Sequence, residues 1–245
     1  MDRLPRIAGL WPICVNADNK VLILFMKKLL FVLATALMLV SCESKDGMLY
    51  RTLMYGFVLE DGSLYADDGC TYTFNNLSSF TQLPEPEDRI LALFDVVEAE
   101  EGSETRFRAM LLQYVLPLYK PVDLCGSDAE IERYGQDPIN ISALGYSGGC
   151  INMENEIVVI SGSDVKHLVS LVHDGARSSE DTVKFVLCHD AGDDAVVKDF
   201  DITARYGFYS SFPIRDLLPE KDSFVLEIKY FWGDEWHKQY KTIGK

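Results

Sequence analysis

Short alternating segments between turn residues restrict the fold of this chain more than any other feature. Residues 70–74 alternate strictly, and the turn signals Asp61-Gly62 and Asp67-Asp68-Gly69 come before them. Alternation places every second side chain on one face of a strand, whereas a helix needs apolar residues three or four positions apart. The pattern therefore predicts an all-β fold.

Residues 49–126 contain five predicted strands and no convincing helix. The strands are expected at residues 53–60, 63–66, 70–74, 89–98 and 104–118. Residues 75–88 contain two prolines and are expected to form a loop. This number of short strands fits a small OB-like barrel, which we predict for residues 49–126.

The second half of the chain is also rich in strands. They are expected at residues 150–160, 165–173, 182–189, 201–209, 224–232 and 235–242. Segment 165–173 could be strand or helix by periodicity, and its alternation between two turns favours a strand. Short strands at this spacing predict a β-sandwich over residues 137–245.

A short helix is expected between the two halves. Ser127 and Glu130 have the spacing of a capping box, in which a helix begins after the serine. The helix should reach Tyr134, because Gly135 and Pro138 then interrupt it. We place the domain boundary in this segment.

The N-terminus has a basic pair followed by an apolar run. Lys27 and Lys28 precede an uncharged run of 12 residues at 29–40. A membrane-spanning helix needs about 20 residues, so the run is typical of a secretory signal peptide rather than of a span. The alternatives, a buried helix or a membrane anchor, do not explain the lysine pair. We expect a signal peptide at 26–41 and an over-extended start at 1–25.

The end of the apolar run, Leu39-Val40-Ser41-Cys42, resembles the bacterial lipobox. In that motif the cysteine becomes the first mature residue and carries the lipid. The resemblance implies that the signal peptide is cleaved and that a lipid on Cys42 holds the protein to a membrane, with residues 42–48 as a tether. Glu43 replaces the aspartate that often marks inner-membrane retention. We therefore expect the outer membrane, on its periplasmic face or at the cell surface.

The charge of the chain disfavours nucleic acid as a partner. The formal net charge is −15, and residues 42–245 hold 18 basic and 36 acidic residues, which gives −18. Phosphate binding relies on clustered lysine and arginine. The hydrophobic fraction of 48% also excludes a mainly disordered chain.

Four cysteines remain after Cys42 in the exported part of the chain. They are Cys70, Cys125, Cys150 and Cys188. An oxidising compartment permits disulfides, and pairing within each half (Cys70 with Cys125, Cys150 with Cys188) is the simplest expectation. Buried free thiols are the alternative. The spacing does not match a metal site.

Several segments resemble the NigD-like lipoproteins. Residues 55–58, with the turns that follow, are similar to the N-terminal half of that family, and residues 137–141, 148–152 and 187–193 are similar to its C-terminal half. The resemblance implies an OB-like domain and a β-sandwich in a lipoprotein of Bacteroidetes-type bacteria. It supplies no catalytic residue and no cofactor. Cysteines at 150 and 188 depart from the family pattern, and their joint presence favours a disulfide between them.

One motif suggests catalysis. Residues 145–149 match G-x-S-x-G, with Ser147 as the nucleophile. That motif requires a helix after the serine, whereas residues 150–153 have the pattern of a strand. A hydrolase is therefore the least favoured function, and the protein is expected not to be an enzyme.

Segment 189–194 is the strongest polar cluster, and His189 and Asp190 are candidate ligand-binding residues in it. A Ca²⁺ site usually needs six or more oxygen ligands, so a polar turn is the simpler interpretation. His167 and His173 would share one face of a strand, but a zinc site needs a third ligand. We predict no metal and no cofactor.

Trp232 and Trp236 flank a predicted turn at residues 233–234 and could stack on sugar rings. Most other aromatic residues nearby are expected in the core. The sequence thus predicts a non-catalytic binding module at the cell envelope, whose partner is a saccharide, a peptide or an envelope protein. The association of NigD-like proteins with bacteriocin genes implies immunity as an alternative function.

Overall fold

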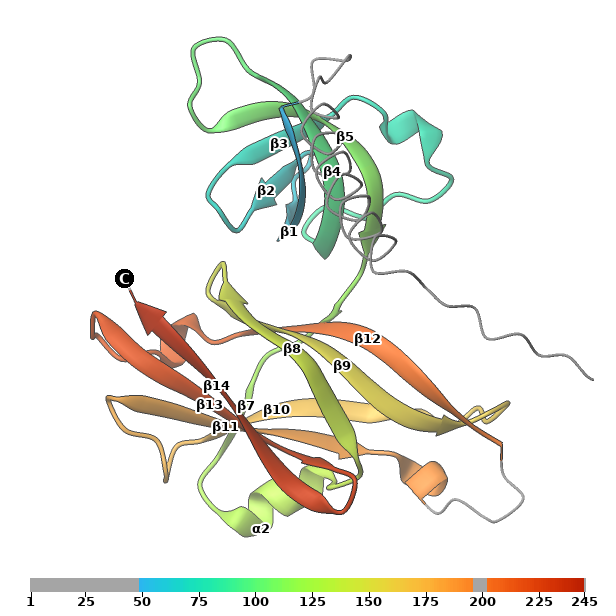
Figure 1. Ribbon diagram of the computed structural model, residues 1–245, viewed down its shortest axis with the longest axis vertical. Coiled ribbons are helices and arrows are strands. Elements are labelled where there is room, and N and C mark those ends of the chain that lie inside the picture. The colour runs from blue at the N-terminus through green and yellow to red at the C-terminus, as the bar shows by residue number, and fades with distance from the viewer. Residues whose placement is uncertain (1–48, 196–201, 245) are drawn as a thin grey trace, which may run out of the picture. The chain divides into compact units, whose positions relative to one another are not determined.

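The computed structural model describes residues 49–195 and 202–244, so the predicted signal peptide, Cys42 and the tether lie outside the described residues. The described secondary structure is almost entirely strands, with one short α-helix and four 3₁₀ turns (Figure 1). The all-β prediction is confirmed. Within these two ranges, no helix is long and apolar enough to cross a membrane.

A closed five-stranded barrel forms the first part of the fold. Its strands are β1 (Tyr50–Val58), β2 (Leu64–Ala66), β3 (Thr71–Phe74), β4 (Arg89–Ala99) and β5 (Arg106–Val115). Around the barrel their order is β1-β2-β3-β5-β4, and only the pairing of β3 with β5 is parallel. The predicted OB-like barrel is therefore confirmed.

The alternation of β3 fills the barrel with aromatic rings. Tyr72 and Phe74 point inward, and their ring centroids lie 4.6 and 5.6 Å from that of Phe94 on β4. Tyr72 and Phe94 are fully buried, while the intervening Thr73 is exposed. The loop after β3 carries the 3₁₀ turn η1 (Leu77–Ser79), and Leu77 packs against this core.

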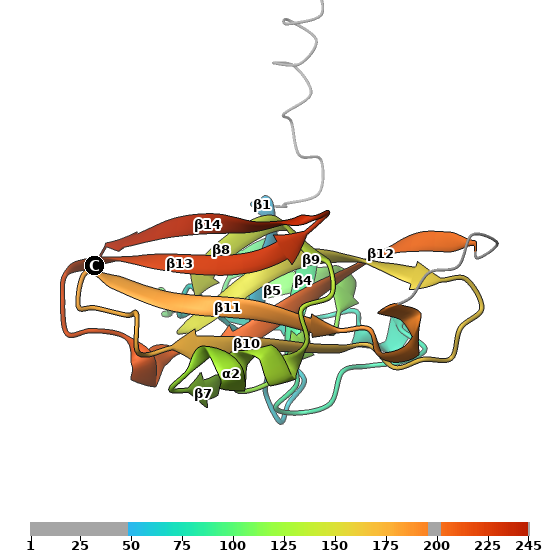
Figure 2. The ribbon, with the colours of Figure 1, turned by 90° about the horizontal axis from the view of Figure 1, so that it is seen from below.

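The predicted β-sandwich is also confirmed. Its strands are β6 (Leu118–Tyr119), β7 (Asp123–Cys125), β8 (Ile139–Ser147), β9 (Cys150–Ile160), β10 (Leu168–Asp174), β11 (Thr182–Asp190), β12 (Thr203–Pro213), β13 (Ser223–Trp232) and β14 (Glu235–Gly244). One sheet has the order β14-β13-β11-β10-β7 and the other β6-β12-β9-β8. Figure 2 shows the strands of the five-stranded sheet side by side.

The core of the sandwich lies between the two sheets. Alternate residues of β13, namely Phe224, Leu226, Ile228 and Tyr230, point into it and are buried. Phe212 on β12 contributes from the opposite sheet and is also fully buried. The residues between them on β13 point outward, and they contribute to a cavity on the outer face of the sheet.

The predicted helix is present, as α2 (Asp128–Ile131) followed by the 3₁₀ turn η2 (Glu132–Tyr134). Ile131 packs on the outer face of the five-stranded sheet against Val172, Val186 and Cys188. β11 is therefore buried on both faces, which agrees with its nearly continuous apolar sequence. Two further 3₁₀ turns, η3 (Gly192–Ala195) and η4 (Arg215–Leu217), follow β11 and β12.

The boundary predicted between residues 126 and 137 is wrong. β6 pairs with β12 and β7 pairs with β10, so residues 118–125 belong to the sandwich and not to the barrel. Pro117 explains the difference, because a proline lacks the N–H that a strand ladder needs. The long strand expected at 104–118 therefore ends at Val115, and the chain passes to the second domain earlier than predicted.

The two predicted disulfides do not form, and all four cysteines are free thiols. Cys70 packs against the barrel core, whereas Cys125 lies on β7 of the sandwich. Cys150 begins β9 in one sheet, whereas Cys188 lies under α2 on the outer face of the other. Each expected pair is thus divided between two cores or two sheets. Burial raises the pKa of the Cys188 thiol to about 12, so the thiol stays protonated near neutral pH.

Arg89 on β4 joins the barrel to the sandwich. Its side chain is fully buried, and its Nη1 and Nη2 donate to both carboxylate oxygens of Asp67 at 3.0 and 2.7 Å. Its Nε donates to Oγ of Ser211 on β12 at 2.6 Å. The guanidinium also lies 5.3 and 5.0 Å from the ring centroids of Tyr55 and Phe57. One buried cation therefore binds groups of both domains.

Ser147 completes this junction and is not placed as a nucleophile. Its Oγ donates to Oδ2 of Asp67 at 2.6 Å and accepts from Nδ2 of Asn152 at 2.9 Å. Gly148 and Gly149, both with positive φ, turn the chain directly from β8 into β9. The G-x-S-x-G segment is thus a hairpin turn followed by a strand, as its sequence suggested. A Cβ at Gly148 would collide with the Asp67 carboxylate.

Candidate functional site

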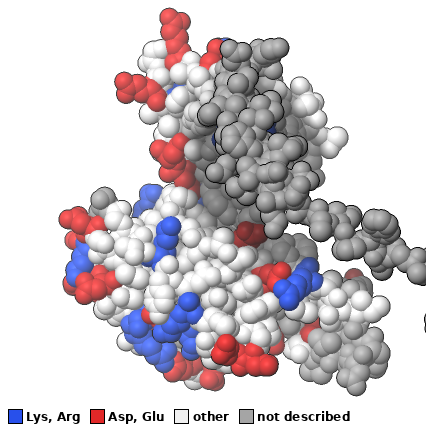
Figure 3. All heavy atoms as spheres, in the orientation of Figure 1, with Lys and Arg blue, Asp and Glu red and all other residues white. Residues whose placement is uncertain are grey.

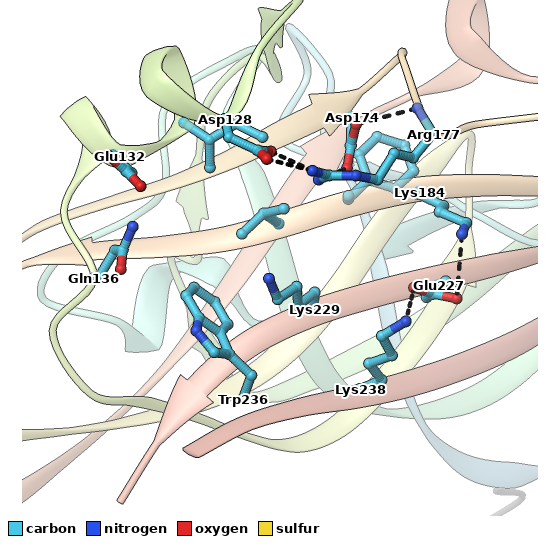
Figure 4. A pocket seen from close by; sticks show the side chains of 13 residues that line it. Asp128, Glu132, Gln136, Asp174, Arg177, Lys184, Glu227, Lys229, Trp236 and Lys238 are labelled. Atoms are coloured by element: carbon cyan, nitrogen blue, oxygen red, sulfur yellow. Dashed lines mark hydrogen bonds and ion pairs between the residues drawn. The ribbon is translucent and has the colours of Figure 1, made fainter. Parts of the chain in front are cut away.

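A cavity of about 380 Å³ lies on the outer face of the five-stranded sheet, beside α2 and η2 (Figure 4). Ligand pockets commonly have volumes of roughly 300–1,000 Å³. The residues that line the cavity come from the α2–η2 segment, the turn after β10, and β11, β13 and β14. They are Asp128, Ile131, Glu132, Gln136, Asp174, Arg177, Lys184, Phe185, Val186, Glu227, Lys229, Trp236 and Lys238.

Strand alternation brings the polar residues to this face. Because Leu226, Ile228 and Tyr230 point into the core, Glu227 and Lys229 must point outward. The hairpin from β13 to β14 then places Trp236 opposite Phe231 and Lys238 opposite Lys229. These side chains share the outer face with Lys184 of β11, which is opposite Glu227.

Most of the charges in the cavity are paired. Arg177 binds the carboxylates of Asp128 and Asp174. Lys238 lies 2.7 Å from Glu227, and Lys184 lies 4.0 Å from the same carboxylate. Hydrogen bonds from Arg177 lower the pKa of Asp128. Figure 3 shows basic side chains gathered beside acidic ones toward the lower left, although the chain as a whole is acidic.

Lys229 differs from these residues, because no carboxylate of the described residues lies within 4.0 Å of its Nζ. It lies opposite Lys238 across the strand pair, and like charges in that position repel. Lys238 forms its ion pair with Glu227. The Nζ of Lys229 lies instead 4.0 Å from the ring centroid of Trp236. The cavity thus contains a cation beside an indole ring, without a carboxylate partner.

Trp236 is held in place but remains accessible. It is 38% exposed, and its ring meets that of Phe231 edge to face at 5.4 Å. Glu132 and Gln136 line the same cavity, and in Figure 4 they lie above and to the left of Trp236. Glu132 forms no ion pair with the described residues, so its carboxylate is free to accept hydrogen bonds.

Trp232, the other predicted ligand-binding tryptophan, lies elsewhere. It is on the core-facing side of β13 and packs against the sandwich core, with the Arg205 guanidinium 5.7 Å from its ring centroid. The two tryptophans therefore belong to opposite faces of the sheet. The structure assigns only Trp236 to the cavity.

His189 is buried at 1% exposure inside the sandwich. Its Nδ1 lies 3.0 Å from the carbonyl oxygen of Pro138, and its Nε2 lies 2.9 Å from Nδ1 of His167. Nε2 of His167 lies 3.2 Å from Oδ2 of Asp194. The two imidazole rings stack at 5.1 Å. A side chain enclosed in this way does not offer a ligand-binding surface.

The contacts of His189 favour its neutral form. The carbonyl of Pro138 only accepts hydrogen bonds, so Nδ1 of His189 is the donor to it. Burial lowers the pKa of His189, which disfavours a charge on this ring. Hydrogen bonds from Ser163 and His167 lower the pKa of the Asp194 carboxylate.

The remaining polar candidates do not converge on one site. Oδ1 of Asp190 accepts from the amide of Gly192, which closes the turn after β11. His173 contacts Oγ of Ser178 at 3.2 Å and lies apart from His167, which precedes β10. Among the described residues, no three His, Cys, Asp or Glu side chains lie close enough to hold a metal ion.

Comparison with known proteins identifies the second domain. Residues 121–241 match the model of the family described as the NigD-like C-terminal beta sandwich domain. The chain carries a NigD-like C-terminal domain. The match begins before β7 and ends within β14, and the predicted resemblance to NigD-like proteins is confirmed. No curated protein matches the chain significantly.

Solved structures of similar fold include the barrel as well. A protein of unknown function from Bacteroides vulgatus has a TM-score of 0.61 at 14% identity, with 80% of this chain and 91% of that chain covered. A NigD-like immunity protein from Bacteroides caccae has a TM-score of 0.51 at 17% identity, covering 78% and 91%. A lipoprotein candidate from Bacteroides fragilis has a TM-score of 0.51 at 12% identity, covering 80% and 98%. These TM-scores establish a common fold.

Proposed function

We propose that this protein is a non-catalytic lipoprotein of the cell envelope that binds an acidic saccharide in the cavity on the outer face of the five-stranded sheet. The lipobox-like sequence at Cys42 supports an anchor in the outer membrane. The lipoprotein candidate of similar fold from Bacteroides fragilis also supports an envelope location.

The observation that carries this proposal is the placement of Lys229 beside Trp236. A free ammonium group favours a ligand carboxylate, and an exposed indole ring offers a flat apolar surface on which a sugar ring stacks. The neighbouring charges already bind one another, so Lys229 is the cation that remains for a ligand.

Glu132 and Gln136 supply polar groups for the hydroxyls of a sugar. A carboxylate accepts hydrogen bonds from hydroxyl groups, and an amide both donates and accepts. Both residues line the same cavity as Trp236. A ligand with a carboxylate, a ring and several hydroxyls therefore fits this set better than an apolar molecule. Salt should weaken its binding, because the contact with Lys229 is partly exposed to solvent.

Replacing Trp236 with alanine should abolish most of the binding of an acidic sugar. We expect titration calorimetry with oligogalacturonate to show an affinity at least about tenfold lower than in the wild type, which corresponds to about 1.4 kcal/mol. Loss of the stacking surface is the physical reason. Tyr240→Ala is the matched control, since Tyr240 is 60% exposed on the same strand and does not line the cavity.

The charge of Lys229 is tested separately. Lys229→Met should weaken oligogalacturonate but not the neutral parent sugar, whereas Lys241→Met on the same hairpin should change neither. If the wild type binds no member of a panel of acidic and neutral oligosaccharides, the proposal is wrong. Equal binding by the wild type and Trp236→Ala would place the saccharide elsewhere.

Immunity against a bacteriocin is the second candidate function. It is favoured by one observation, the similar fold of a NigD-like immunity protein from Bacteroides caccae. Its partner would be the toxin polypeptide rather than a sugar. A deletion strain should then become more sensitive to bacteriocins of neighbouring strains, and unchanged sensitivity would exclude this function.

A further inference from the structure

One edge of the four-stranded sheet is open along most of β12. This strand pairs with β9 from Thr203 to Pro213, but on its other side it pairs with β6 only at Ser210 and Ser211. The edge from Thr203 to Tyr209 therefore has no strand beside it among the described residues. Exposed edges of this kind offer unpaired backbone groups to another chain.

The hydrogen bonds at the two ends of β12 show which backbone groups are free. The carbonyl of Ile202 accepts from the amide of Ser161 at 2.7 Å, and the amide of Ile214 donates to Gly149 at 2.9 Å. Because the ladder alternates, the even-numbered residues between them bond to β9. The amides and carbonyls of Arg205 and Gly207 and the amide of Tyr209 therefore point to the open edge, while the carbonyl of Tyr209 faces β6.

A groove of about 710 Å³ runs beside this edge. Most of the residues that line it are apolar or aromatic. They are Leu116, Leu118, Lys120, Asp123, Tyr134, Ile157, Lys166, His167, Leu168, Val169, Ser170, Tyr206, Phe208 and Tyr209. Tyr206 lies on the same face of β12 as Phe208 and the buried Phe212, yet it is 58% exposed. A core-facing position is thus left uncovered at this end of the sandwich.

The opposite wall of the groove is closed to a further strand. Nζ of Lys120 donates to the carbonyl of Val169 at 3.1 Å and to Oγ of Ser170 at 2.9 Å, which caps the edge of β10. Lys166, at the same groove, has no carboxylate within 4.0 Å among the described residues. The groove therefore has one open backbone edge, an apolar floor and an unmatched positive charge.

We propose that this groove binds an extended segment of another polypeptide, which pairs with β12 as an added strand. Only a peptide backbone supplies donors and acceptors at the spacing of the free groups on Arg205 and Gly207. Its alternate side chains are apolar and cover Tyr206 and Leu168, which are both largely exposed. An acidic end meets Lys166. A second copy fits less well, because the charge of −15 makes two copies repel.

The proposal is tested with synthetic peptides that alternate threonine with valine, leucine or tyrosine between glutamate ends. Fluorescence anisotropy with the purified full chain should show saturable binding of at least one peptide. Tyr206→Lys should weaken it by about tenfold or more, since the substitution places a charge on the apolar floor. Tyr65→Lys, at a tyrosine that is 49% exposed on β2 of the barrel, should leave binding unchanged.

Amide exchange locates the bound strand. With peptide present, the amides of Arg205, Gly207 and Tyr209 should exchange more slowly, and a peptide N-methylated at alternate amides should not bind. The proposal is overturned if no peptide binds, or if Tyr206→Lys binds a peptide as well as the wild type does. It is also overturned if protection from amide exchange is confined to other strands. A chain that is already dimeric through β12 would overturn it as well. Sugar binding at Trp236 is independent of each result.

Discussion

Replacing Arg89 with methionine should lower the free energy of unfolding by about 3 to 5 kcal/mol. Methionine retains most of the apolar stem but removes the guanidinium, which leaves the Asp67 carboxylate, 9% exposed, without its cation. The substitution also removes the donor to Ser211, so both domains lose a contact. Urea unfolding of the variant measures the loss directly.

Arg108→Met is the matched control for this effect. Arg108 lies on the same barrel and pairs with Glu98 at 2.9 Å, but both side chains are more than half exposed. Exposed ion pairs contribute roughly 0 to 1 kcal/mol, so this variant should unfold almost like the wild type. If Arg89→Met and Arg108→Met lose the same stability, the buried pair does not join the two domains as described.

Replacing His189 with alanine should also destabilise the protein strongly, by about 2 to 4 kcal/mol. The substitution leaves a cavity in the place of a buried ring. It also leaves the Pro138 carbonyl and one nitrogen of His167 without their partner. His237→Ala is the control, because His237 is partly exposed, with one hydrogen bond to the carbonyl of Trp232 and the Glu235 carboxylate 3.8 Å away. Its ring also stacks on Tyr230 at 5.5 Å. That variant should lose about 1 kcal/mol at most.

His189→Ala should also change how the stability of the protein depends on pH. Burial lowers the pKa of His189 and of His173 from the ordinary value of 6.5. Below about pH 6.5 the unfolded chain therefore binds more protons than the folded chain, and the wild type loses stability as pH falls from 7 to 5. His189→Ala lacks the contribution of His189 and retains that of His173, so its loss of stability should be shallower. An unchanged slope would contradict the assignment of His189 as a buried neutral ring.

The fold could be predicted from the sequence because its signals are local. The alternation at residues 70–74 and the turns before it indicate the strands of the barrel. The strand pattern of residues 150–153 argues against a nucleophile elbow at Ser147. The position of β7 could not be predicted in this way. Its three residues pair in parallel with Val172–Asp174, about fifty positions later, and such long-range pairings leave little local trace.

The candidate site was predicted only in part, for a related reason. Aromatic residues beside a turn predict Trp236 as a binding residue, but they predict Trp232 equally. The alternation of β13 places Trp232 on the core-facing side of the strand. Lys229 gave no signal on its own, because a lysine between apolar residues is typical of any solvent-facing strand position. The cavity around it depends on α2 packing beside the sheet, which is a tertiary contact.

The proposed sugar site is tested most directly by the indole N–H signal of Trp236 in a two-dimensional NMR spectrum of the ¹⁵N-labelled protein. The signal is assigned by its absence in Trp236→Tyr, and Trp232, on the opposite face of the sheet, is the internal reference. On titration with oligogalacturonate, the account predicts that the Trp236 signal shifts progressively while the Trp232 signal stays in place. A Trp236 signal that does not move, at sugar concentrations that saturate binding elsewhere on the protein, would contradict it.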